Sequence, residues 1–444
     1  MNARARASGF WGKWESVVRM LGAETALSVL GLVTNVATAR ALSPLGKGEL
    51  TAVLLWPALF AAFGGLGLSH SAVYFAGQRE DDIGVVAGVS FVTSLVTSVL
   101  IGIAGWVSMP YVLTDYAPEI VRAAQWIFAW SVVPTLGFTA QMLLLGVGQF
   151  AAFNQMRITQ QVAYTGGVVA LWALGLVSVQ AILVVYVASQ AVVFVWGMVL
   201  TARLVERWGY STSLLKDMLR YGAKMMVSGW AGVANMQLDQ ALISIFLSPA
   251  TLGLYKVAVS SIQGVKLLGV GFGRVLLSDV SRSRSRAASH AQILDMAKAG
   301  AKTVTVAAVV SVVAMPVALP LVFGPAFAAA VVPAQILCLA GAVLGVRQIV
   351  YNGERGRGRP EVGLYSELVG VGVTVVGLYT LLPQFGITGA ALTSVAAYAV
   401  SLGVAWAFVR RAARTAVDDP LDGPSGDGVA SAASADPLSV TPAP

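Results

Sequence analysis

The sequence predicts an all-α, polytopic membrane protein with about twelve transmembrane helices in two six-helix bundles related as a parallel repeat. The first observation is composition: charged residues make up 11% of the chain, whereas soluble domains carry about 25%. The second is a mean hydropathy of +0.76, concentrated in segments long enough to cross a bilayer. The third is a short motif that occurs twice at a fixed offset, which predicts two related halves.

The apolar segments justify the predicted helices in order. Each is close to the roughly 20 residues that a spanning helix needs, and none shows the short alternation of barrel strands. The first half holds six segments: 17–39, 50–75, 83–107, 120–145, 158–177 and 180–204. The second half also holds six: 222–247, 253–277, 301–323, 328–351, 362–382 and 386–409.

The repeated motif is the connection between the first two segments of each half. Leu42–Gly48 recurs loosely as Leu247–Gly253, about 205 residues further along the chain. Both copies begin Leu-Ser-Pro and place a glycine four residues after the proline. Internal repeats of this kind are typical of membrane transporters, and six spans per half make the repeat parallel.

Lysine and arginine predict the orientation, because cytoplasmic loops are enriched in both. They cluster in the N-terminal tail, in the loops after the sixth, eighth and tenth spans, and after the last span. The connections on the other side contain almost none; Arg40 and Lys47 in the first outer loop and Arg122 just inside the fourth span are exceptions. We therefore expect both termini in the cytoplasm, and we interpret the net charge of +8 as this topology signal rather than as nucleic-acid binding.

The chain divides into five predicted parts, read from hydropathy and charge. They are a cytoplasmic N-terminal segment (1–16), an N-terminal six-helix bundle (17–204), a cytoplasmic linker (205–221), a C-terminal six-helix bundle (222–409) and a disordered cytoplasmic tail (410–444). The tail is rich in proline, glycine, serine and aspartate, which do not build a core.

No catalytic, metal-binding or cofactor-binding motif is present in the sequence. There are two histidines and one cysteine, and no phosphate loop, dinucleotide fingerprint or zinc-protease motif. Since no outer loop exceeds about a dozen residues, well below domain size, an enzyme that works on an external loop is disfavoured. We expect no cofactor and no enzymatic activity.

Polar residues inside spans are the candidate functional residues, because each is costly in a membrane unless it is paired or lines a cavity. Helical spacing places one polar stripe on the seventh span: Lys224, Ser228, Asn235 and Asp239. A second stripe lies on the eighth span: Lys256, Ser260, Gln263, Arg274 and, at its margin, Lys266.

Two interpretations of these stripes remain open. Asp239 and Lys256 lie at similar depth in consecutive spans, so they either form a structural ion pair or belong to a hydrated cavity with surplus positive charge. A further pair, Glu24 in the first span and His70 in the second, is a conceivable proton site. The simpler interpretation of that pair is an interfacial carboxylate and a hydrogen-bonded histidine.

Several short motifs, in order along nearly the whole chain except the tail, resemble a known transporter family. They are Ala39–Pro44 with Gly48 and Glu49, Asn235–Asp239, Leu252–Ala258, Phe323–Phe327, Gly358–Pro360 and Leu382–Ala391. Together they resemble the polysaccharide-transporter, or O-antigen flippase, branch of the multidrug/oligosaccharidyl-lipid/polysaccharide exporter superfamily. Gly146–Phe150 departs from the family pattern by having Gln149 where arginine is usual.

The resemblance implies a flippase that moves an undecaprenyl-diphosphate-linked oligosaccharide to the outer leaflet of a bacterial cytoplasmic membrane, by alternating access and with proton or sodium antiport. A polysaccharide polymerase machinery would be its partner. The candidate cationic substrate cavity then comprises Lys224, Lys256, Lys266, Arg274 and Arg347 with Asn235 and Gln263, and the candidate ion-coupling residues are Asp239, Glu24 and His70.

Two other functions stay open at this point. A small-molecule or drug antiporter of the same superfamily would have an acidic or aromatic cavity rather than a cationic one. A membrane polysaccharide polymerase or ligase is disfavoured by the short outer loops.

Overall fold

The computed structural model describes residues 3–79, 82–283 and 286–417, and these residues form helices and no strand. The first half contains α1 (Ala3–Gly64), α2 (Leu68–Gln78), α3 (Ile83–Val112), α4 (Pro118–Ala129), α5 (Val132–Gly146), α6 (Phe150–Ala173) and α7 (Val179–Leu204). The second half contains α8 (Thr212–Phe246), α9 (Pro249–Ser260), α10 (Ile262–Arg282), α11 (Arg286–Phe323), the 3₁₀ helix η2 (Pro325–Ala330), α12 (Val331–Gly356) and α13 (Glu361–Val417). The predicted all-α class is confirmed.

Not every predicted span corresponds to one helix, because some helices extend over two spans and some spans are divided between two helices. Two long helices extend over two predicted spans: α1 breaks at Ser43, between the first span and the start of the second, and α13 breaks at Gly386; the backbone is not helical at either residue. Conversely, three predicted spans are each split into two helices, namely α1–α2, α4–α5 and α9–α10. By length and hydropathy alone, six described helices can cross a membrane, or seven if the α4–α5 pair, bent by 41°, is one span.

The ends of the predicted parts differ from the structure. Helix α1 already begins at Ala3, inside the predicted N-terminal segment, and α8 begins inside the predicted linker. At the other end α13 continues to Val417, so the predicted disordered tail is wrong for 410–417; residues 418–444 lie outside the described part.

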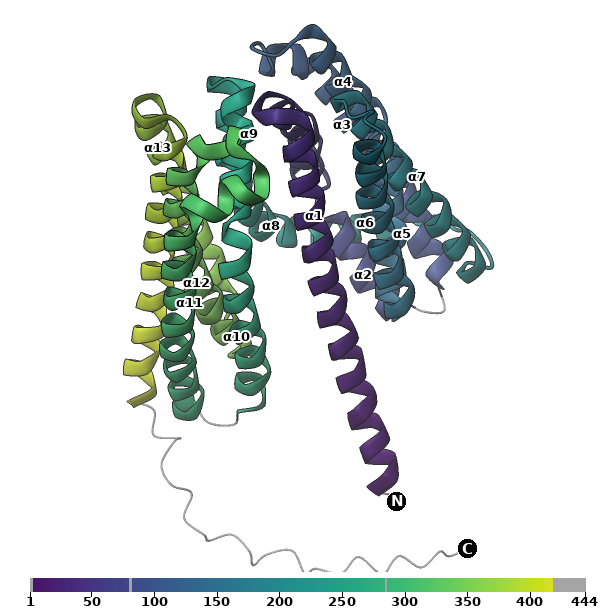
Figure 1. The fold of residues 1–444 in the computed structure, drawn as a ribbon. Helices are drawn as coiled ribbons and strands as arrows, with labels where there is room; N and C mark the ends of the chain where they lie inside the picture. Colours follow the sequence, from purple (N-terminus) through teal and green to yellow (C-terminus); the bar gives the residue numbers. More distant parts are fainter. Residues whose placement is uncertain (1–2, 80–81, 284–285, 418–444) are drawn as a thin grey trace, which may run out of the picture.

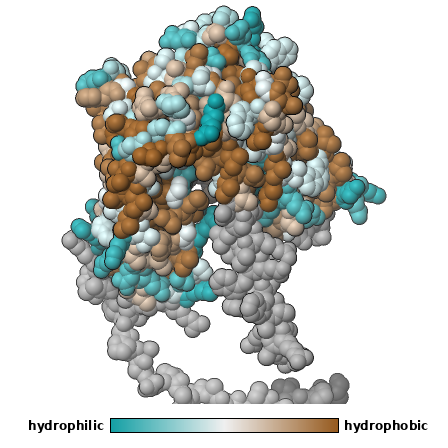
Figure 2. All heavy atoms as spheres, viewed as in Figure 1, coloured by the Kyte–Doolittle hydropathy of each residue, from teal (hydrophilic) through white to brown (hydrophobic). Residues whose placement is uncertain are grey.

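Figure 1 shows the two sets of helices, with α1 running between them and with the start of α1 and the end of α13 towards the same end of the molecule. Within the first set α5 packs on α7 and α1 on α6, and within the second α12 packs on α10, α11 and α13. Figure 2 shows a broad hydrophobic band across the middle of this face, with hydrophilic residues gathered towards the two ends. Apolar side chains such as Val313 and Tyr379, 74% and 84% exposed, match a lipid-facing surface.

The two copies of the repeated motif pack against each other at the end of the molecule opposite the start of α1 and the end of α13. A Cβ atom on Gly48 would lie 1.6 Å from the Pro249 carbonyl oxygen, and one on Gly253 would lie 2.0 Å from the Pro44 carbonyl oxygen. Each glycine therefore admits the backbone of the other copy. This reciprocity is what a pseudo-twofold relation between the halves requires, since each copy contacts the same position of its partner.

Other glycines also bring helices together. Gly67 and Gly222 pack α2 on α8, and Gly269 packs α10 on Gly345 of α12; in both places a Cβ would fall within 2.6 Å of backbone atoms. The run Gly64–Gly67 also interrupts the helix, because Leu66 and Gly67 take left-handed backbone angles. Close packing and local unwinding thus occur together at this run.

Candidate functional site

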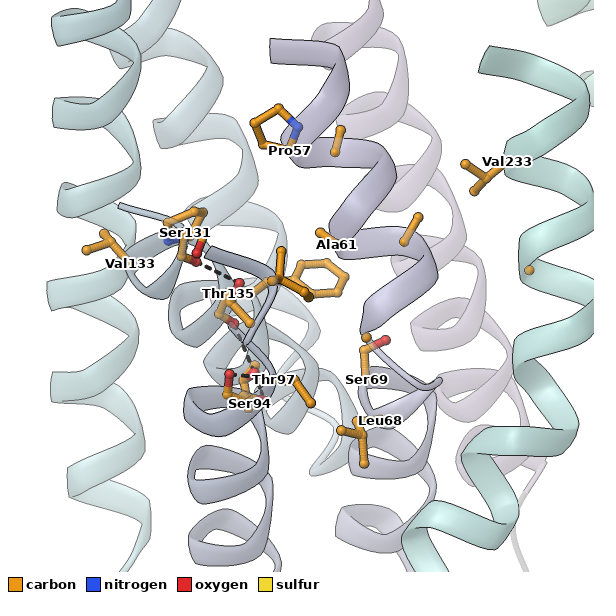
Figure 3. Close-up of a pocket in the computed structure, with 18 of the residues that line it drawn as sticks. Pro57, Ala61, Leu68, Ser69, Ser94, Thr97, Ser131, Val133, Thr135 and Val233 are labelled. Carbon is orange, nitrogen blue, oxygen red and sulfur yellow. Dashed lines mark hydrogen bonds between the residues drawn. The ribbon is translucent and has the colours of Figure 1, made fainter. Parts of the chain in front are cut away.

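A cavity of about 560 Å³ lies between the first half and α8, the first helix of the second half. Its walls come from α1, α2, α3, α5, α7 and α8, with the α4–α5 break at their edge (Figure 3). The cavity therefore depends on both halves. Because α8 also carries the connection to α9, movement of the second half would move one wall of the cavity.

One wall of this cavity is lined by hydroxyl groups. Figure 3 shows Ser94 and Thr97 of α3 near Ser131 and Thr135 of the α4–α5 region, with Val233 of α8 on the far side. The hydroxyl of Thr135 donates to the Ser131 carbonyl at 2.7 Å, and that of Thr97 donates to Thr93 at 2.9 Å. Since their protons are used internally, these hydroxyls present acceptor lone pairs to the cavity.

Breaks in two spans position this wall. The α4–α5 bend falls at Trp130–Ser131, where the Ser131 hydroxyl leaves its own helix and donates to the Ser98 carbonyl of α3 at 2.9 Å. A second bond, between the hydroxyls of Ser94 and Thr139 at 2.7 Å, joins α3 to α5. These two links hold the hydroxyls at fixed separation.

Aromatic rings and donors complete the lining. Trp130, Phe138, Tyr186 and Trp230 contribute rings. Polar groups with free donor capacity come from Gln190, Ser69 and His70. Flat rings beside hydroxyls and amides are suited to a ligand that has both hydroxyl groups and apolar ring faces.

A buried ion pair of the described residues lies outside this cavity, in the second half. Arg347 of α12 is 2% exposed and forms an ion pair with Glu367 of α13 at 3.0 Å. Its guanidinium also donates to the Ser401 hydroxyl at 3.1 Å and stacks between Tyr351 and Tyr398, 5.2 and 5.0 Å from the ring centres. Arg347 is thus held by partners from two spans inside the bundle.

Asn235 of α8 joins the same network. Its side-chain amide donates to the Glu367 carbonyl oxygen at 2.9 Å and contacts the Glu367 carboxylate. The network therefore links α8, α12 and both segments of α13.

Asp239 and Lys256 are neighbours but do not form a direct ion pair, which was one of the two interpretations that the sequence left open. The Asp239 carboxylate accepts from the Tyr255 hydroxyl at 2.6 Å and from the Gln240 backbone amide at 2.7 Å. Lys256 donates instead to the side-chain oxygen of Gln240 at 3.0 Å. Among the described residues no ion pair joins them, because the hydroxyl and the amide take the nearest positions.

The remaining predicted cavity residues occupy varied positions. Helix α9 ends and α10 begins around Ser261, which interrupts the stripe predicted on the eighth span. Beyond this break Gln263 and Arg274 are exposed and Lys266 is half-buried. Lys266 and Arg274 make no hydrogen bond or ion pair with other described residues, and the side chain of Lys224 lies outside the described part. None of the six predicted substrate residues whose side chains are described lines the cavity of Figure 3.

The predicted pair of Glu24 and His70 is not brought together. Glu24 forms an ion pair with Arg157 of α6 at 2.8 Å, with the two side chains 33% and 29% exposed. His70 is exposed on α2 and lines the cavity.

Two lysine and arginine exceptions in the first outer loop also have partners. Lys47 is 5% exposed and donates to the Thr38 hydroxyl at 2.7 Å, so it lies inside the hairpin rather than in an open loop. Arg40 donates to the Val322 carbonyl at 2.7 Å and to that of Leu321, at the C-terminal end of α11. A cation there compensates the negative end of the helix dipole and ties the two halves together.

Sequence reasoning missed Glu367, Tyr255 and the hydroxyl wall. The signal for Glu367 was present, since it is a carboxylate six residues into an apolar span that already resembled a membrane helix. The hydroxyl wall gave no signal, because serine and threonine occur throughout the spans and bond their own helix backbone.

Solved structures similar to this chain are membrane transporters. The lipid II flippase MurJ in an inward closed conformation superposes with a TM-score of 0.72 at 11% identity, over 88% of this chain and 87% of that one. An inward-facing multidrug resistance MATE family transporter of the MOP superfamily gives 0.70 at 14% identity, over 89% and 96%. A MOP superfamily transporter from Pyrococcus furiosus, described as having a binding pocket of reverse polarity, gives 0.58 at 16% identity, over 89% and 96%. The fold is therefore that of the MOP-superfamily transporters and flippases.

The family model of the polysaccharide biosynthesis proteins matches residues 37–333, and the chain belongs to this family. No curated protein sequence matches the chain. The family is thus one of polysaccharide biosynthesis proteins, and the fold is the one that solved flippases and transporters share, as the sequence analysis predicted.

Proposed function

We propose that this protein moves a lipid-diphosphate-linked oligosaccharide across the bacterial cytoplasmic membrane for cell-surface polysaccharide biosynthesis. The observation that carries the proposal is the cavity between the first half and α8, whose lining combines hydroxyls, an amide and aromatic rings. Sugars present hydroxyl donors and apolar ring faces, and this lining matches both. The name of the matching family, polysaccharide biosynthesis protein, agrees with a saccharide substrate.

Alternating access supplies the mechanism. The two motif copies close the outer end through Gly48 and Gly253, and Arg40 adds a link from α1 to α11. Beyond this contact α9 packs on α1, whereas its continuation α10 packs on α11 and α12. We infer that the structure is closed on the outer side, that both termini are cytoplasmic, and that opening the hairpin contact releases substrate outward.

Lys266 and Arg274 lie on α10 and do not line the cavity between the first half and α8. They are our candidates for contacting the diphosphate during its passage, because neither is bonded to another described side chain. Lysine would act as a point charge and arginine as a fork. Arg347 is a weaker candidate, since Glu367 already neutralises it.

Asp239 is our candidate for proton or sodium coupling. It is buried, it belongs to the helix that lines the cavity, and its carboxylate is held by a hydroxyl and an amide rather than by a cation. Glu24 is a weaker candidate because Arg157 neutralises it.

The test is transport by the purified protein in vesicles. A fluorescent polyprenyl-diphosphate oligosaccharide should become accessible to a membrane-impermeant reagent on the opposite side only when the protein is present. Arg274→Gln should slow this step at least tenfold, whereas Arg411→Gln, beyond the last predicted span, should not. Equal rates in protein-free vesicles would refute the proposal.

An ion gradient tests the coupling within the same vesicles. Imposed proton or sodium gradients should accelerate transport by the wild type and have no effect on Asp239→Asn. A gradient response that survives in Asp239→Asn would remove Asp239 from the coupling role.

A drug antiporter is the second candidate, and the aromatic rings of the cavity favour it. The discriminating measurement offers a cationic dye, in place of the saccharide, to the same vesicles. Gradient-driven dye export without saccharide transfer would establish this alternative and exclude the flippase.

A further inference from the structure

A second hollow, an apolar crevice of about 600 Å³, lies beside the cavity. Its walls come from the part of α1 that follows Ser43, from α3 and from α8. Every lining residue except Thr97 is apolar or glycine, and the rings of Trp56, Phe60 and Phe63 form much of one side. The crevice therefore offers almost no hydrogen-bonding group to an occupant.

The crevice and the cavity adjoin. Thr97 and Ile101, one helical turn apart on α3, line both of them. On one side of these two residues the wall carries the hydroxyls of Ser94 and Thr139; on the other it carries Leu100 and Ala104. The lining thus changes from polar to hydrocarbon within about two turns of one helix.

The crevice reaches the outer surface of the helices. Leu100 is 61% exposed and Phe63 and Leu66 are each 38% exposed, although all three line the crevice. In a membrane protein such exposed apolar residues contact lipid. A chain lying in the crevice can therefore continue into the bilayer.

We propose that this crevice holds the hydrocarbon chain of the transported lipid while its saccharide head occupies the cavity. The inference rests on the proposed function, and it adds the route by which the lipid part leaves the site. Head and chain are covalently joined, so the head can enter the cavity only if the chain has an apolar path out. The crevice is such a path, because it shares a wall with the cavity and ends at the lipid-facing surface.

This arrangement does not require a strong attraction for the chain. Hydrocarbon gains little by moving from lipid to an equally apolar wall. The crevice acts through the covalent bond between head and chain: a chain already in the crevice raises the local concentration of the head at the cavity. Blocking the crevice should therefore weaken binding of the linked molecule and leave binding of the head alone unchanged.

The test fills the crevice and compares two probes that share one head. Ala104→Trp and, separately, Leu100→Trp place an indole in the crevice from exposed positions of α3 that avoid the buried core. Ile103→Trp is the matched control, since Ile103 is 58% exposed on the same helix and lines neither hollow. The probes are a long-chain polyprenyl-diphosphate sugar and the same sugar diphosphate with a methyl group in place of the chain, measured on protein in phosphatidylglycerol nanodiscs.

We expect wild type and Ile103→Trp to bind the long-chain probe at least tenfold more tightly than the methyl probe, and both crevice variants to lose this difference. Retention of the full difference in both crevice variants would overturn the inference. Loss of the difference in the wild type when free phosphatidylglycerol is added in excess would also overturn it, because the crevice would then be an ordinary lipid contact. Binding of neither probe by the wild type would refute the proposed function and the inference with it, whereas binding of the methyl probe alone refutes only the inference.

Discussion

The first half of the molecule surrounds its cavity with hydroxyls and rings, whereas the second half buries charges that bond one another. In the first half Ser94 and Thr139 join two helices through neutral hydroxyls, and the ion pair of Glu24 is partly exposed. In the second half Arg347 and Glu367 are 2% and 14% exposed and pair at 3.0 Å. Two halves that share the repeated motif therefore differ in the polar groups that they contain.

This difference indicates that the two halves have different roles. A neutral hydrogen-bonding wall can exchange partners with a sugar at low cost, since each hydroxyl keeps acceptor capacity. A buried ion pair cannot exchange so cheaply, because separating its members leaves an unpaired charge. We therefore interpret the first half as the adaptable binding side and the second half as a rigid body whose position is set by its charges.

The largest expected effect comes from breaking the charge network of the second half. Glu367→Gln should lower the free energy of unfolding by about 3–5 kcal/mol, the usual loss when one partner of a buried ion pair is removed. Thermal unfolding in detergent measures it. The double variant Glu367→Gln with Arg347→Met should recover most of the loss, since no unpaired charge remains.

The matched control is the ion pair of the first half. Glu24→Gln should cost about 1 kcal/mol or less, because Glu24 and Arg157 are a third exposed. Equal losses for Glu24→Gln and Glu367→Gln would mean that the two halves do not differ in this way.

The next largest effect concerns the repeated motif, which the two halves share. Gly48→Val should cost about 3 kcal/mol, since its Cβ would overlap the Pro249 carbonyl oxygen and the hairpins would be forced apart. Cysteine accessibility of the outer end should rise in this variant. Gly31→Ala is the control: no atom lies within 4 Å of its Cβ, so helix propensity should make it neutral or slightly stabilising.

The structural features that the sequence predicts well are those that depend on a regular period or on a repeated motif. The Leu-Ser-Pro spacing predicted two related connections, and the structure brings Gly48 and Gly253 together at them. Apolar length predicted the spans, although their breaks fall where local chemistry decides, as at Gly64–Gly67. A hydropathy pattern carries no information on which turn will unwind.

The parts that sequence reasoning could not place depend on contacts between distant spans. Arg347 looked like a cation for a cavity until α13 supplied Glu367 and Ser401. Asp239 and Lys256 matched in depth, yet Tyr255 and Gln240 lie between them, which no spacing rule predicts. The cavity wall likewise needs α3, α5, α7 and α8 together.

Two tyrosines, one in each half, test the comparison with an expected change in unfolding free energy of intermediate size. Tyr255→Phe should lower the free energy of unfolding by about 2 kcal/mol, because the buried Asp239 carboxylate loses a hydrogen bond of 2.6 Å. Tyr164→Phe in the first half should be nearly neutral, since the Tyr164 hydroxyl makes no hydrogen bond with described residues and its ring contact with Tyr186 remains. Chemical denaturation of both variants measures the difference, and a similar loss in each would contradict it.

The smallest effect distinguishes the two serines of the repeated motif. Ser248 caps α9 in an ordinary extended conformation and accepts from the Thr251 amide, whereas Ser43 has φ 62° and ψ 173°, a region that normally requires glycine. Ser43→Gly should therefore stabilise the protein by about 1 kcal/mol, while Ser248→Gly should cost only a few tenths. Alanine reverses the ranking: Ser43→Ala keeps the strain and should be neutral, and Ser248→Ala loses the cap at a cost of about 1 kcal/mol. Melting temperatures of these four variants give the answer. If glycine acts alike at both positions, the first copy is not strained, and the two connections are equivalent in energy as well as in spacing.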